Sequence, residues 1–321
     1  MQQTQYPPPP GEEPDNTYDP LADTLPIHRF DPLAETRYHQ IMRPRHSRRW
    51  KKTVRVLTLL AVSIIALFLT YLLAPNRINI LILGIDARPG EENYGRSDTI
   101  ILSTILPLRG SVRALSIPRD LWVTIPGYGE NRINTAHFFG ELEAAGNGPN
   151  AAMKAIQHNF GVKPQYFLRI RFDGFREFID ALGGIDVEIP RPMSGYPAGV
   201  HHLDGEKALA LARDRSGSDD FFRMERGQIV IRSVIKHTLK PTHWPRLFAA
   251  LPVLPKMIDA NIPFWQYPRI ALVMLRAGSD GIDTKAITRD MITPFTTDGG
   301  ANVLLPNWDL ILPVVQEMFG K

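Results

Sequence analysis

A long uncharged segment, VLTLLAVSIIALFLTYLLA at 56–74, constrains this chain more than any other feature. As a helix rising about 1.5 Å per residue, these nineteen residues would extend about 28 Å. That length matches the hydrocarbon core of a bilayer, which is about 30 Å thick. A buried helix of a globular domain is usually apolar on one face, whereas this segment is apolar all round. It is also longer, and lies further along the chain, than the apolar core of a signal peptide. We therefore predict a single transmembrane helix.

The charges on either side of this segment predict its orientation. Residues 43–55 (RPRHSRRWKKTVR) hold seven Lys and Arg residues, whereas the flank after the span has only Arg77. Basic flanks of a membrane span stay on the cytoplasmic side. We expect a single-pass protein of the cell membrane whose N-terminus is cytoplasmic and whose residues 76–321 are extracytoplasmic. The basic segment would then contact membrane lipid with anionic headgroups.

Residues 1–42 differ in composition from the rest of the chain. They hold eight prolines and seven acidic residues, against two basic residues, Arg29 and Arg37. Such a segment cannot bury enough apolar surface to offset the entropy lost on ordering. We predict a disordered cytoplasmic tail.

The composition excludes several classes of site. The chain has no cysteine, so disulfides, thiolate metal sites and cysteine nucleophiles are ruled out. Residues 76–321 hold 28 Lys and Arg against 26 Asp and Glu, which leaves no broad basic field for nucleic acid. The chain also lacks the HExxH, GxSxG, Walker and kinase motifs. A partner other than nucleic acid is therefore expected.

Apolar periodicity predicts an α/β domain over 76–321. Strands are expected at 79–87, 98–107, 111–118 and 165–172, and helices at 134–145, 149–160, 203–212 and 221–239. Asn134 is expected to cap its helix, and DGFREFIDALGG reads as a helix ended by glycine. Alternating strands and helices indicate a mixed central sheet layered between helices. Residues 244–278, apolar but broken by prolines, are expected to form short helices over one face of that sheet, with two strands and a helix after them.

Two acidic residues flank the loop between the first two predicted strands. Asp86 ends the first strand and Asp98 begins the second, twelve residues later. Strand ends that face one crevice are the usual ligand site of an α/β sheet. Two carboxylates there can hold Mg²⁺, whose other ligands would be water and phosphate oxygens. Taken alone, the pair is more typical of turn capping.

Arginines gather at the ends of the predicted elements. Guanidinium groups bind phosphate oxygens in pairs and keep their charge, which suits a pyrophosphate ligand. A single arginine is usually a solvated surface residue, so only the presence of several arginines at the ends of these elements indicates a phosphate site. The residues are Arg96, Arg119, Arg132, Arg213, Arg215, Arg223 and Arg226.

Read in order, several segments resemble the LytR-CpsA-Psr family of the outer face of bacterial membranes. The matching segments, within 79–228, are NILILGIDARP, RSDTIIL, LSIPRDLWVTIPG, RINTAHFFG, FDGFREFIDALGGIDVEIP, LDGEKALALARDR and DDFFRMERGQ. The resemblance implies a mixed sheet between helices with an apolar pocket for a polyprenyl chain. It also implies a phosphotransferase that moves a glycopolymer from a polyprenyl pyrophosphate to a sugar hydroxyl of peptidoglycan.

The resemblance further implies roles for individual residues. Asp86 and Asp98 would bind Mg²⁺, or Mn²⁺ in its place, and Arg96 and Arg119 would hold the pyrophosphate. The other residues expected to line or neighbour the site are Arg132, Arg213, Arg215, Asp220, Arg223 and Arg226. Asp98, Arg119 and Asp220 are the predicted catalytic residues, with the general base open between Asp98 and Asp220. Phosphoryl transfer depends mainly on positioning and on charge stabilisation, which such a set supplies.

The chain departs from the family pattern at three points. Arg132 stands where lysine is frequent, Phe139-Gly140 where a glycine pair is common, and Gly227 where glutamine is common. We expect Gly227 to remove one amide contact, and Gln228, about 100° further round a helix, to face elsewhere.

Two other functions stay open from the sequence. The same site could hydrolyse a polyprenyl pyrophosphate, with water as the acceptor, or the chain could be a non-catalytic regulator that binds lipid or glycan. The acidic pair together with the arginines favours catalysis. Residues 244–278 could wall the lipid pocket or simply close the core, and their composition does not separate these alternatives.

Overall fold

The computed structural model describes residues 48–85, 95–214, 220–278 and 281–320. The chain divides into two units, 1–63 and 64–321, and the division falls within helix α2 (Arg48–Leu72). Among the described helices, α2 is the one long and apolar enough to cross a membrane, over Trp50–Leu72. Two of its threonines, Thr58 and Thr70, donate their hydroxyls to carbonyl oxygens four residues earlier, so these groups are satisfied without water. The predicted span is therefore helical, and the helix begins within the basic segment.

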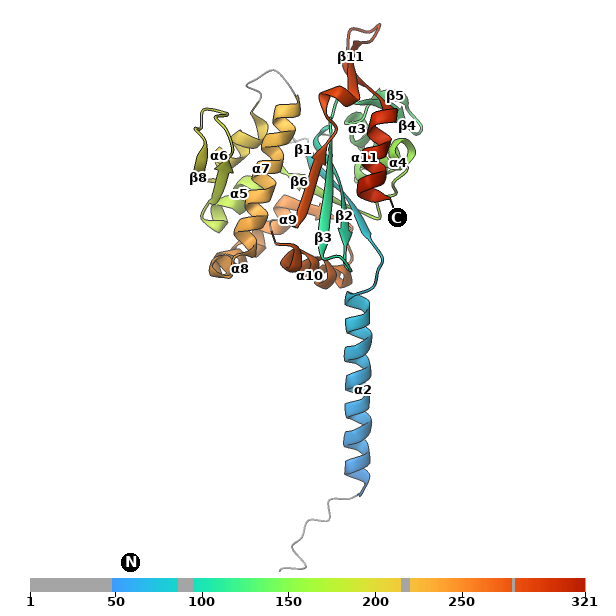
Figure 1. Cartoon of the computed structure of the whole chain (residues 1–321), viewed down its shortest axis with the longest axis vertical. Coiled ribbons are helices and arrows are strands. Elements are labelled where there is room, and N and C mark those ends of the chain that lie inside the picture. Colours follow the sequence, from blue (N-terminus) through green and yellow to red (C-terminus); the bar gives the residue numbers. More distant parts are fainter. Residues whose placement is uncertain (1–47, 86–94, 215–219, 279–280, 321) are drawn as a thin grey trace, which may run out of the picture. The chain divides into compact units, whose positions relative to one another are not determined.

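The second unit is built on a six-stranded sheet in the order β10-β3-β2-β1-β6-β9 (Figure 1). Its strands are β1 (Ile78–Ile85), β2 (Ser97–Leu106), β3 (Ser111–Ile117), β6 (Tyr166–Arg171), β9 (Ile258–Ala260) and β10 (Ile282–Ala286). β2 is antiparallel to both of its neighbours, whereas β1 is parallel to β6 and β3 is parallel to β10. The predicted mixed central sheet is confirmed.

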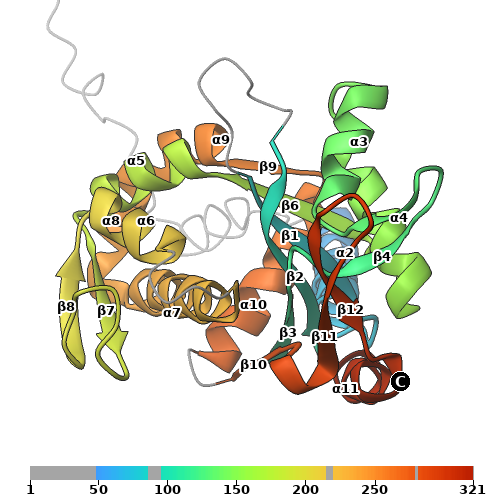
Figure 2. The same ribbon diagram turned by 90° about the horizontal axis from the view of Figure 1, so that it is seen from above.

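Helices cover both faces of this sheet (Figure 2). One face packs on α3 (Thr135–Glu143), α4 (Gly148–Phe160) and α11 (Trp308–Phe319), and the other faces α7 (Asp220–Leu239) and α10 (Tyr267–Ala277). Side chains alternate between the two faces along a strand. Leu81 and Leu83 of β1 accordingly belong to the core beside α4, whereas Ile80 and Ile82 lie on the side of α10.

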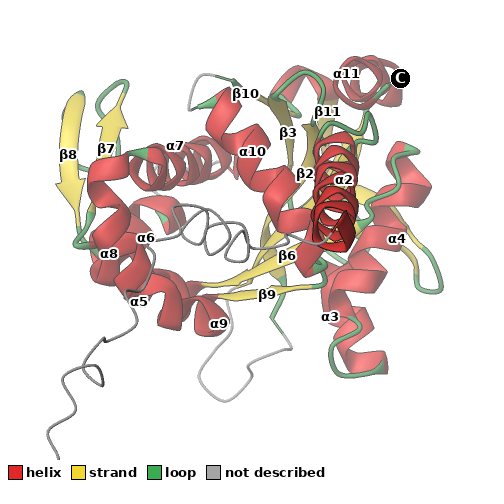
Figure 3. Ribbon diagram, turned by 90° about the horizontal axis from the view of Figure 1, so that it is seen from below, coloured by secondary structure: helices red, strands yellow, loops and turns green. Residues whose placement is uncertain are grey.

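A second core lies on the far side of α7, away from the sheet (Figure 3). It is formed by α5 (Phe172–Leu182), the hairpin of β7 (Ile185–Ile189) and β8 (Gly199–Leu203), α6 (Gly205–Arg213), α8 (Trp244–Ala250) and α9 (Leu254–Met257). α5 ends, as predicted, at a glycine: Gly183 has a φ of 80°, which a side chain would disfavour. This core holds α7 in place, and α7 carries several of the predicted site residues.

The remaining elements are two hairpins and four short 3₁₀ helices. They are β4 (Trp122–Ile125) with β5 (Gly129–Arg132), β11 (Ile292–Thr296) with β12 (Asn302–Pro306), and η1 (Pro241–His243), η2 (Leu251–Val253), η3 (Phe264–Gln266) and η4 (Arg289–Met291). The prediction missed β4, β5, β8 and the edge strands β9 and β10, each of which has five residues or fewer.

Two further expectations need correction. Asn134 makes no side-chain capping bond; instead the hydroxyl of Thr135, the first residue of α3, donates to the carbonyl of Arg132 at 2.7 Å. Residues 244–278 do form short helices, but they do not all cover one face of the sheet: α10 packs on β2 and β3, α9 contacts the edge strands β6 and β9 as well as α5, and α8 packs against α5. The prolines that begin these helices set their bounds but do not determine what they cover.

Candidate functional site

The register of β2 against β3 brings Arg119 to Asp98. Ile100 pairs with Ile117, so Asp98, the second residue of β2, lies opposite Arg119, two residues after the end of β3. Nη1 of Arg119 donates to Oδ1 of Asp98 at 2.7 Å. Because β1 ends at Ile85, which pairs with Ser97, the described end of β1 also lies beside the start of β2.

A second guanidinium reaches the same carboxylate from α7. Nη2 of Arg223 lies 3.9 Å from Oδ1 of Asp98 and donates to the Asp98 carbonyl oxygen at 3.2 Å. The three side chains are largely buried, with 11% of Arg223, 17% of Asp98 and 22% of Arg119 exposed. Partial burial strengthens the attraction of two positive groups for an anionic ligand. Two predicted phosphate-binding arginines therefore converge on one predicted metal ligand.

The charged cluster extends outward through Asp120. Its carboxylate lies 3.4 Å from Nε of Arg119 and 3.4 Å from Nε of Arg132. Nη2 of Arg132 donates to the carbonyl of Asn302 in β12 at 2.7 Å. Asp120 was not predicted as a site residue, although it follows Arg119 directly in the IPRD segment. It orients both arginines.

The other predicted arginines are placed differently. Arg226 is buried and donates to the carbonyl oxygen of Asp214 at 2.7 Å, fastening α7 to the end of α6. Arg96 is exposed just before β2, and Arg213 is exposed with its guanidinium 5.5 Å from the ring centre of Phe172. Asp86, Arg215 and the side chain of Asp220 lie outside the described part of the chain. Within that part, no group of three or more metal-ligating side chains is found.

A small polar cleft of about 20 Å³ opens beside Asp98. Arg223, Gly227 and Gln228 of α7 line it, together with Ser116 of β3. The expectation that Gln228 faces elsewhere is wrong: its Nε2 donates to the Ser116 hydroxyl at 2.7 Å. Because α7 lies along the sheet, the adjacent residues Gly227 and Gln228 both reach the same cleft. A Cβ at Gly227 would meet no atom within 4 Å.

An apolar cavity of about 320 Å³ adjoins this cleft between the sheet and helices α7 and α10. Ile101, Ser116 and Gln228 line both spaces, so the cavity begins where the charged cluster ends. Its wall continues through Ile80, Ile235, Ile270 and Met274 to Tyr267 and Ile282. The end of segment 244–278 thus walls a cavity, in agreement with the pocket alternative for that part of the segment.

A buried ionic network supports the loop before β2, and sequence reasoning missed it. Arg169 of β6 donates to Oε1 of Glu141 at 2.7 Å and contacts Asp259 on its other side. His137, fully buried, lies with Nδ1 3.0 Å from the carbonyl of Gly95 and Nε2 3.4 Å from Arg169. A guanidinium can only donate, so Nε2 accepts and Nδ1 carries the proton.

Burial lowers the pKa of His137 to about 4, and the neighbouring Arg169 adds to the effect. Glu141, 3.7 Å away, opposes this shift without reversing it. The histidine is therefore neutral at pH 7 and fixes the carbonyl immediately before Arg96. Arg169, which shares a strand face with the apolar Phe167 in the segment 165–172, was the signal that could have revealed the network.

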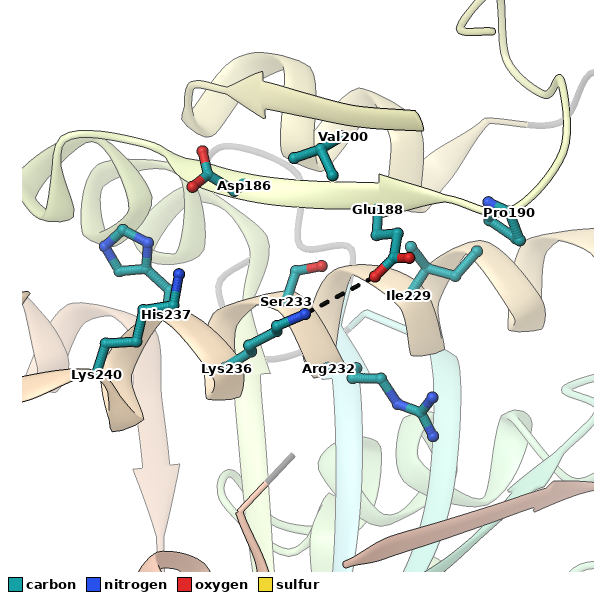
Figure 4. Close-up of a pocket in the computed structure, with 10 residues that line it drawn as sticks. All are labelled: Asp186, Glu188, Pro190, Val200, Ile229, Arg232, Ser233, Lys236, His237 and Lys240. Atoms are coloured by element: carbon teal, nitrogen blue, oxygen red, sulfur yellow. Dashed lines mark ion pairs between the residues drawn. The ribbon is translucent and has the colours of Figure 1, made fainter. Parts of the chain in front are cut away.

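A second cavity, of about 480 Å³, shares no residue with the cluster around Asp98. It lies between β7 and α7 and is lined by charges of both signs (Figure 4). Lys236 and Glu188 face each other across it, with Nζ and Oε2 3.8 Å apart. Its lining holds three basic and two acidic residues, so it is a mixed-charge cavity separate from the Asp98 cluster.

Comparison with known proteins finds relatives over about half of the chain. The chain is 37% identical over 164 residues to the polyisoprenyl-teichoic acid–peptidoglycan teichoic acid transferase TagU of Oceanobacillus iheyensis, covering 49% of this chain and 50% of TagU. It is 30% identical over 195 residues to the regulatory protein MsrR of Staphylococcus aureus (strain COL), covering 58% and 57%. The chain thus spans about half the length of these curated relatives.

Solved structures share the fold. The crystal structure of B. subtilis TagV superposes with a TM-score of 0.62 at 26% identity, covering 76% of this chain and 97% of that one. The LytR-CpsA-Psr family model matches residues 48–304, which include α2, the whole central sheet and every described residue of the Asp98 cluster. The chain therefore belongs to the LytR-CpsA-Psr family.

Proposed function

We propose that this chain is a phosphotransferase that moves a glycopolymer from a polyprenyl pyrophosphate carrier to a sugar hydroxyl of peptidoglycan. The observation that carries the proposal is the junction of a charged cleft and an apolar cavity at Ser116 and Gln228. A ligand with an anionic head and a long apolar tail matches such a junction. The activity named for TagU, a relative at 37% identity, supports this assignment.

The donor would lie with its pyrophosphate against Arg119 and Arg223 and its polyprenyl chain along the cavity. The acceptor hydroxyl attacks the phosphorus that bears the glycan, and a new P–O bond forms to the peptidoglycan sugar. The bond from that phosphorus to the bridging oxygen breaks, and polyprenyl phosphate leaves. Fixed guanidinium groups stabilise the negative charge that builds on the phosphoryl oxygens.

The hydroxyl proton must pass to a base. Asp98 already accepts a hydrogen bond from Arg119 and contacts Arg223, so taking up a proton would weaken both interactions. We assign Asp98 to holding these arginines and a metal ion, which leaves Asp220 as the base. Arg213, Arg215, Arg96 and Arg132 would extend the anion site toward the glycan.

A divalent cation fits the chemistry of this donor set. Asp98, together with Asp86, would hold Mg²⁺ through carboxylate oxygens, the ligands that hard cations prefer. When bound, the ion would neutralise charge on the pyrophosphate. Mn²⁺ takes similar ligands and would substitute.

We also propose that the protein is anchored in the cell membrane by α2, with its N-terminus cytoplasmic and the domain outside. The seven basic residues at 43–55 and the length of α2 support this topology. The donor lipid and peptidoglycan would both be reached from that position, and nucleic acid would not. Protease added to intact spheroplasts should then degrade the domain; its protection would contradict the topology.

The full chain, reconstituted in lipid nanodiscs, tests the function directly. A donor with a labelled glycan is supplied with a peptidoglycan fragment, and the label should become covalently attached to the fragment. Release of a free glycan phosphate would instead establish hydrolysis. Donor that binds but is not consumed would establish a binding regulator. Arg191→Ala, which removes an exposed ion pair with Glu225, serves as an activity control.

A further inference from the structure

Exposed apolar side chains gather at one end of the domain. Outside α2, fifteen large hydrophobic residues are exposed in the described chain, and seven of them lie between 244 and 275. These seven are Trp244, Phe248, Leu251, Phe264, Trp265, Tyr267 and Leu275. They belong to α8, η2, η3 and α10, and α8 and α10 lie at the same end of the domain (Figure 1). We call these seven residues the aromatic edge. A cluster of exposed apolar side chains at one end of a domain indicates a surface that binds another molecule or a membrane.

The chain that leaves α2 is fastened to this edge. The hydroxyl of Tyr71, in the last turn of α2, donates to the carbonyl oxygen of Trp265 at 2.7 Å. Arg269 of α10 lies 5.2 Å from the Tyr71 ring centre and donates to the carbonyls of Ala74 and Asn76 at 2.8 and 3.1 Å. Arg269 is buried, with 3% exposed, so this attachment is part of the packed structure.

These contacts determine what lies next to the edge. The final turn of a membrane-spanning helix lies at the bilayer surface, and Trp265 is one hydrogen bond from it. Phe264 and Trp265 are 76% and 52% exposed. Trp and Tyr are the residues that concentrate at the headgroup level of membranes, because their rings are apolar and their polar atoms can stay hydrated.

The charges around the aromatic edge are also suited to a membrane surface. Residues 240–276 hold five Lys and Arg against one acid, Asp259, which is paired with Arg169. Arg269 is buried and Lys256 is paired with Glu177, so the exposed basic residues left are Lys240, Arg246 and Arg276. Such an excess attracts a surface that carries anionic lipid.

We propose that the aromatic edge rests in the headgroup layer of the bilayer that α2 crosses, and so holds the mouth of the apolar cavity against the membrane. Tyr267 links the two, because it lines the cavity and is 52% exposed at the edge. An isoprenoid tail could then pass from the bilayer to the cavity without exposing its apolar surface to water. The passage of the tail rests on the proposed transferase activity, whereas the docking of the edge rests only on the proposed membrane anchor α2.

Quenching by lipid tests the docking. The full chain is reconstituted in nanodiscs that contain anionic lipid with acyl chains brominated near the headgroup. In one variant Trp265 is the sole tryptophan, and in a matched control Trp308, packed on Phe160, is the sole one; the others become Phe. Brominated lipid should quench Trp265 strongly and Trp308 little. Equal quenching of the two, with the chain in the nanodisc, would overturn the proposal.

A second measurement uses the unsubstituted chain, so it tests the docking even if the tryptophan variants fail to fold. Hydrogen exchange at 264–267 should slow when anionic lipid replaces neutral lipid in nanodiscs that hold one copy each. If that protection appears only in nanodiscs with two copies, the edge is a contact between copies and the proposal is wrong.

The exposed pair Phe264 and Trp265 tests the link to the cavity. The double variant F264S/W265S should lower turnover of a long-chain donor in the bilayer by about tenfold, the loss expected for one poorly buried aromatic side chain. Turnover of a short-chain, water-soluble donor should not change. If the wild type consumes neither donor, the proposed function fails while quenching still decides the docking. Wild-type turnover of both donors by the double variant would refute the cavity link.

Discussion

Arg119 and Asp98 are 21 residues apart in the chain, yet the register of two antiparallel strands joins them at 2.7 Å. Their pairing has a consequence for the site. The carboxylate fixes the guanidinium where α7 delivers a second one, Arg223, so two positive groups share one anchor before any ligand binds. An anion that reaches them therefore meets a preorganised site, which is what stabilises charge during a reaction.

Removing one of these groups should affect turnover far more than folding. Arg119→Ala deletes a charge next to the proposed pyrophosphate, and loss of such a donor typically lowers the rate by about 10²–10³. The melting temperature should change little, because Arg119 belongs to no hydrophobic core cluster and Arg223 still contacts Asp98 when Arg119 is removed. Turnover and thermal unfolding are measured side by side with Arg191→Ala as the control. Near wild-type turnover by a folded Arg119→Ala would rule out the assignment.

The metal assignment predicts a specific response to chelation and to Asp98→Asn. EDTA should abolish transfer, and added Mg²⁺ or Mn²⁺ should restore it. The amide of Asp98→Asn retains an oxygen but loses the charge, so the variant should need a higher Mg²⁺ concentration for half-maximal turnover. The Mg²⁺ dependence of each protein gives this value. Full activity of the wild type in EDTA would remove the metal from the mechanism.

The central sheet and its helices could be predicted because their signals are local. The strand predicted at 79–87 holds a run of residues without a polar side chain at 80–85, and the helix before Gly183 ends on a residue suited to left-handed backbone. The edge strand β10 could not be predicted in the same way. Ile282–Ala286 contains two charged residues in five, and it forms a strand because β3 offers an open edge with matching register. Tertiary pairing of this kind overrides local propensity.

The site was predictable in its residue types and less so in its contacts. The Asp98–Arg119 pair follows from two adjacent strand ends. The role of Asp120, the His137–Glu141–Arg169 network and the inward position of Gln228 each depend on how separate elements pack together. Two neighbouring helical residues point about 100° apart, but this angle alone does not show which side chain reaches a cleft. A helix that lies on a sheet contacts it with several residues per turn, so Gly227 and Gln228 both line the same cleft.

Gly227 offers a test that separates helix propensity from site chemistry. Its Cβ position is empty within 4 Å, so Gly227→Ala should stabilise α7 by about 1 kcal/mol. The matched control is Gly174→Ala in α5, where a Cβ would lie 2.4 Å from Cα of Met257 and should destabilise the fold. Thermal unfolding compares the two variants. Destabilisation by Gly227→Ala would contradict the open space described here.

Gly227→Gln extends this test to the donor. The added amide would enter the cleft beside Asp98 and Gln228 and should narrow the range of donor glycans that are accepted. Turnover of a small and a large donor glycan is compared with that of the wild type. An unchanged ratio would mean that the space at Gly227 does not select the donor.

The buried histidine predicts how stability depends on pH. His137 has a pKa of about 4 in the folded chain, so between pH 4 and its usual value near 6.5 it binds a proton only when the chain unfolds. Stability from this residue is therefore complete above about pH 6.5 and is lost as the pH falls toward 4. A shift of this size corresponds to about 3 kcal/mol.

His137→Gln removes this dependence. The glutamine amide can still donate to the Gly95 carbonyl but does not titrate, so the variant should be less stable than the wild type at pH 7 yet lose less stability between pH 6.5 and 4. Glu141, Arg169 and Asp259 face the residue in both proteins, and the difference between the two curves isolates the histidine. Urea unfolding of the full chain across this range gives both curves. His158→Gln, exposed on α4, should keep the wild-type slope. If His137→Gln also kept it, the neutral buried histidine would be the wrong description of this network.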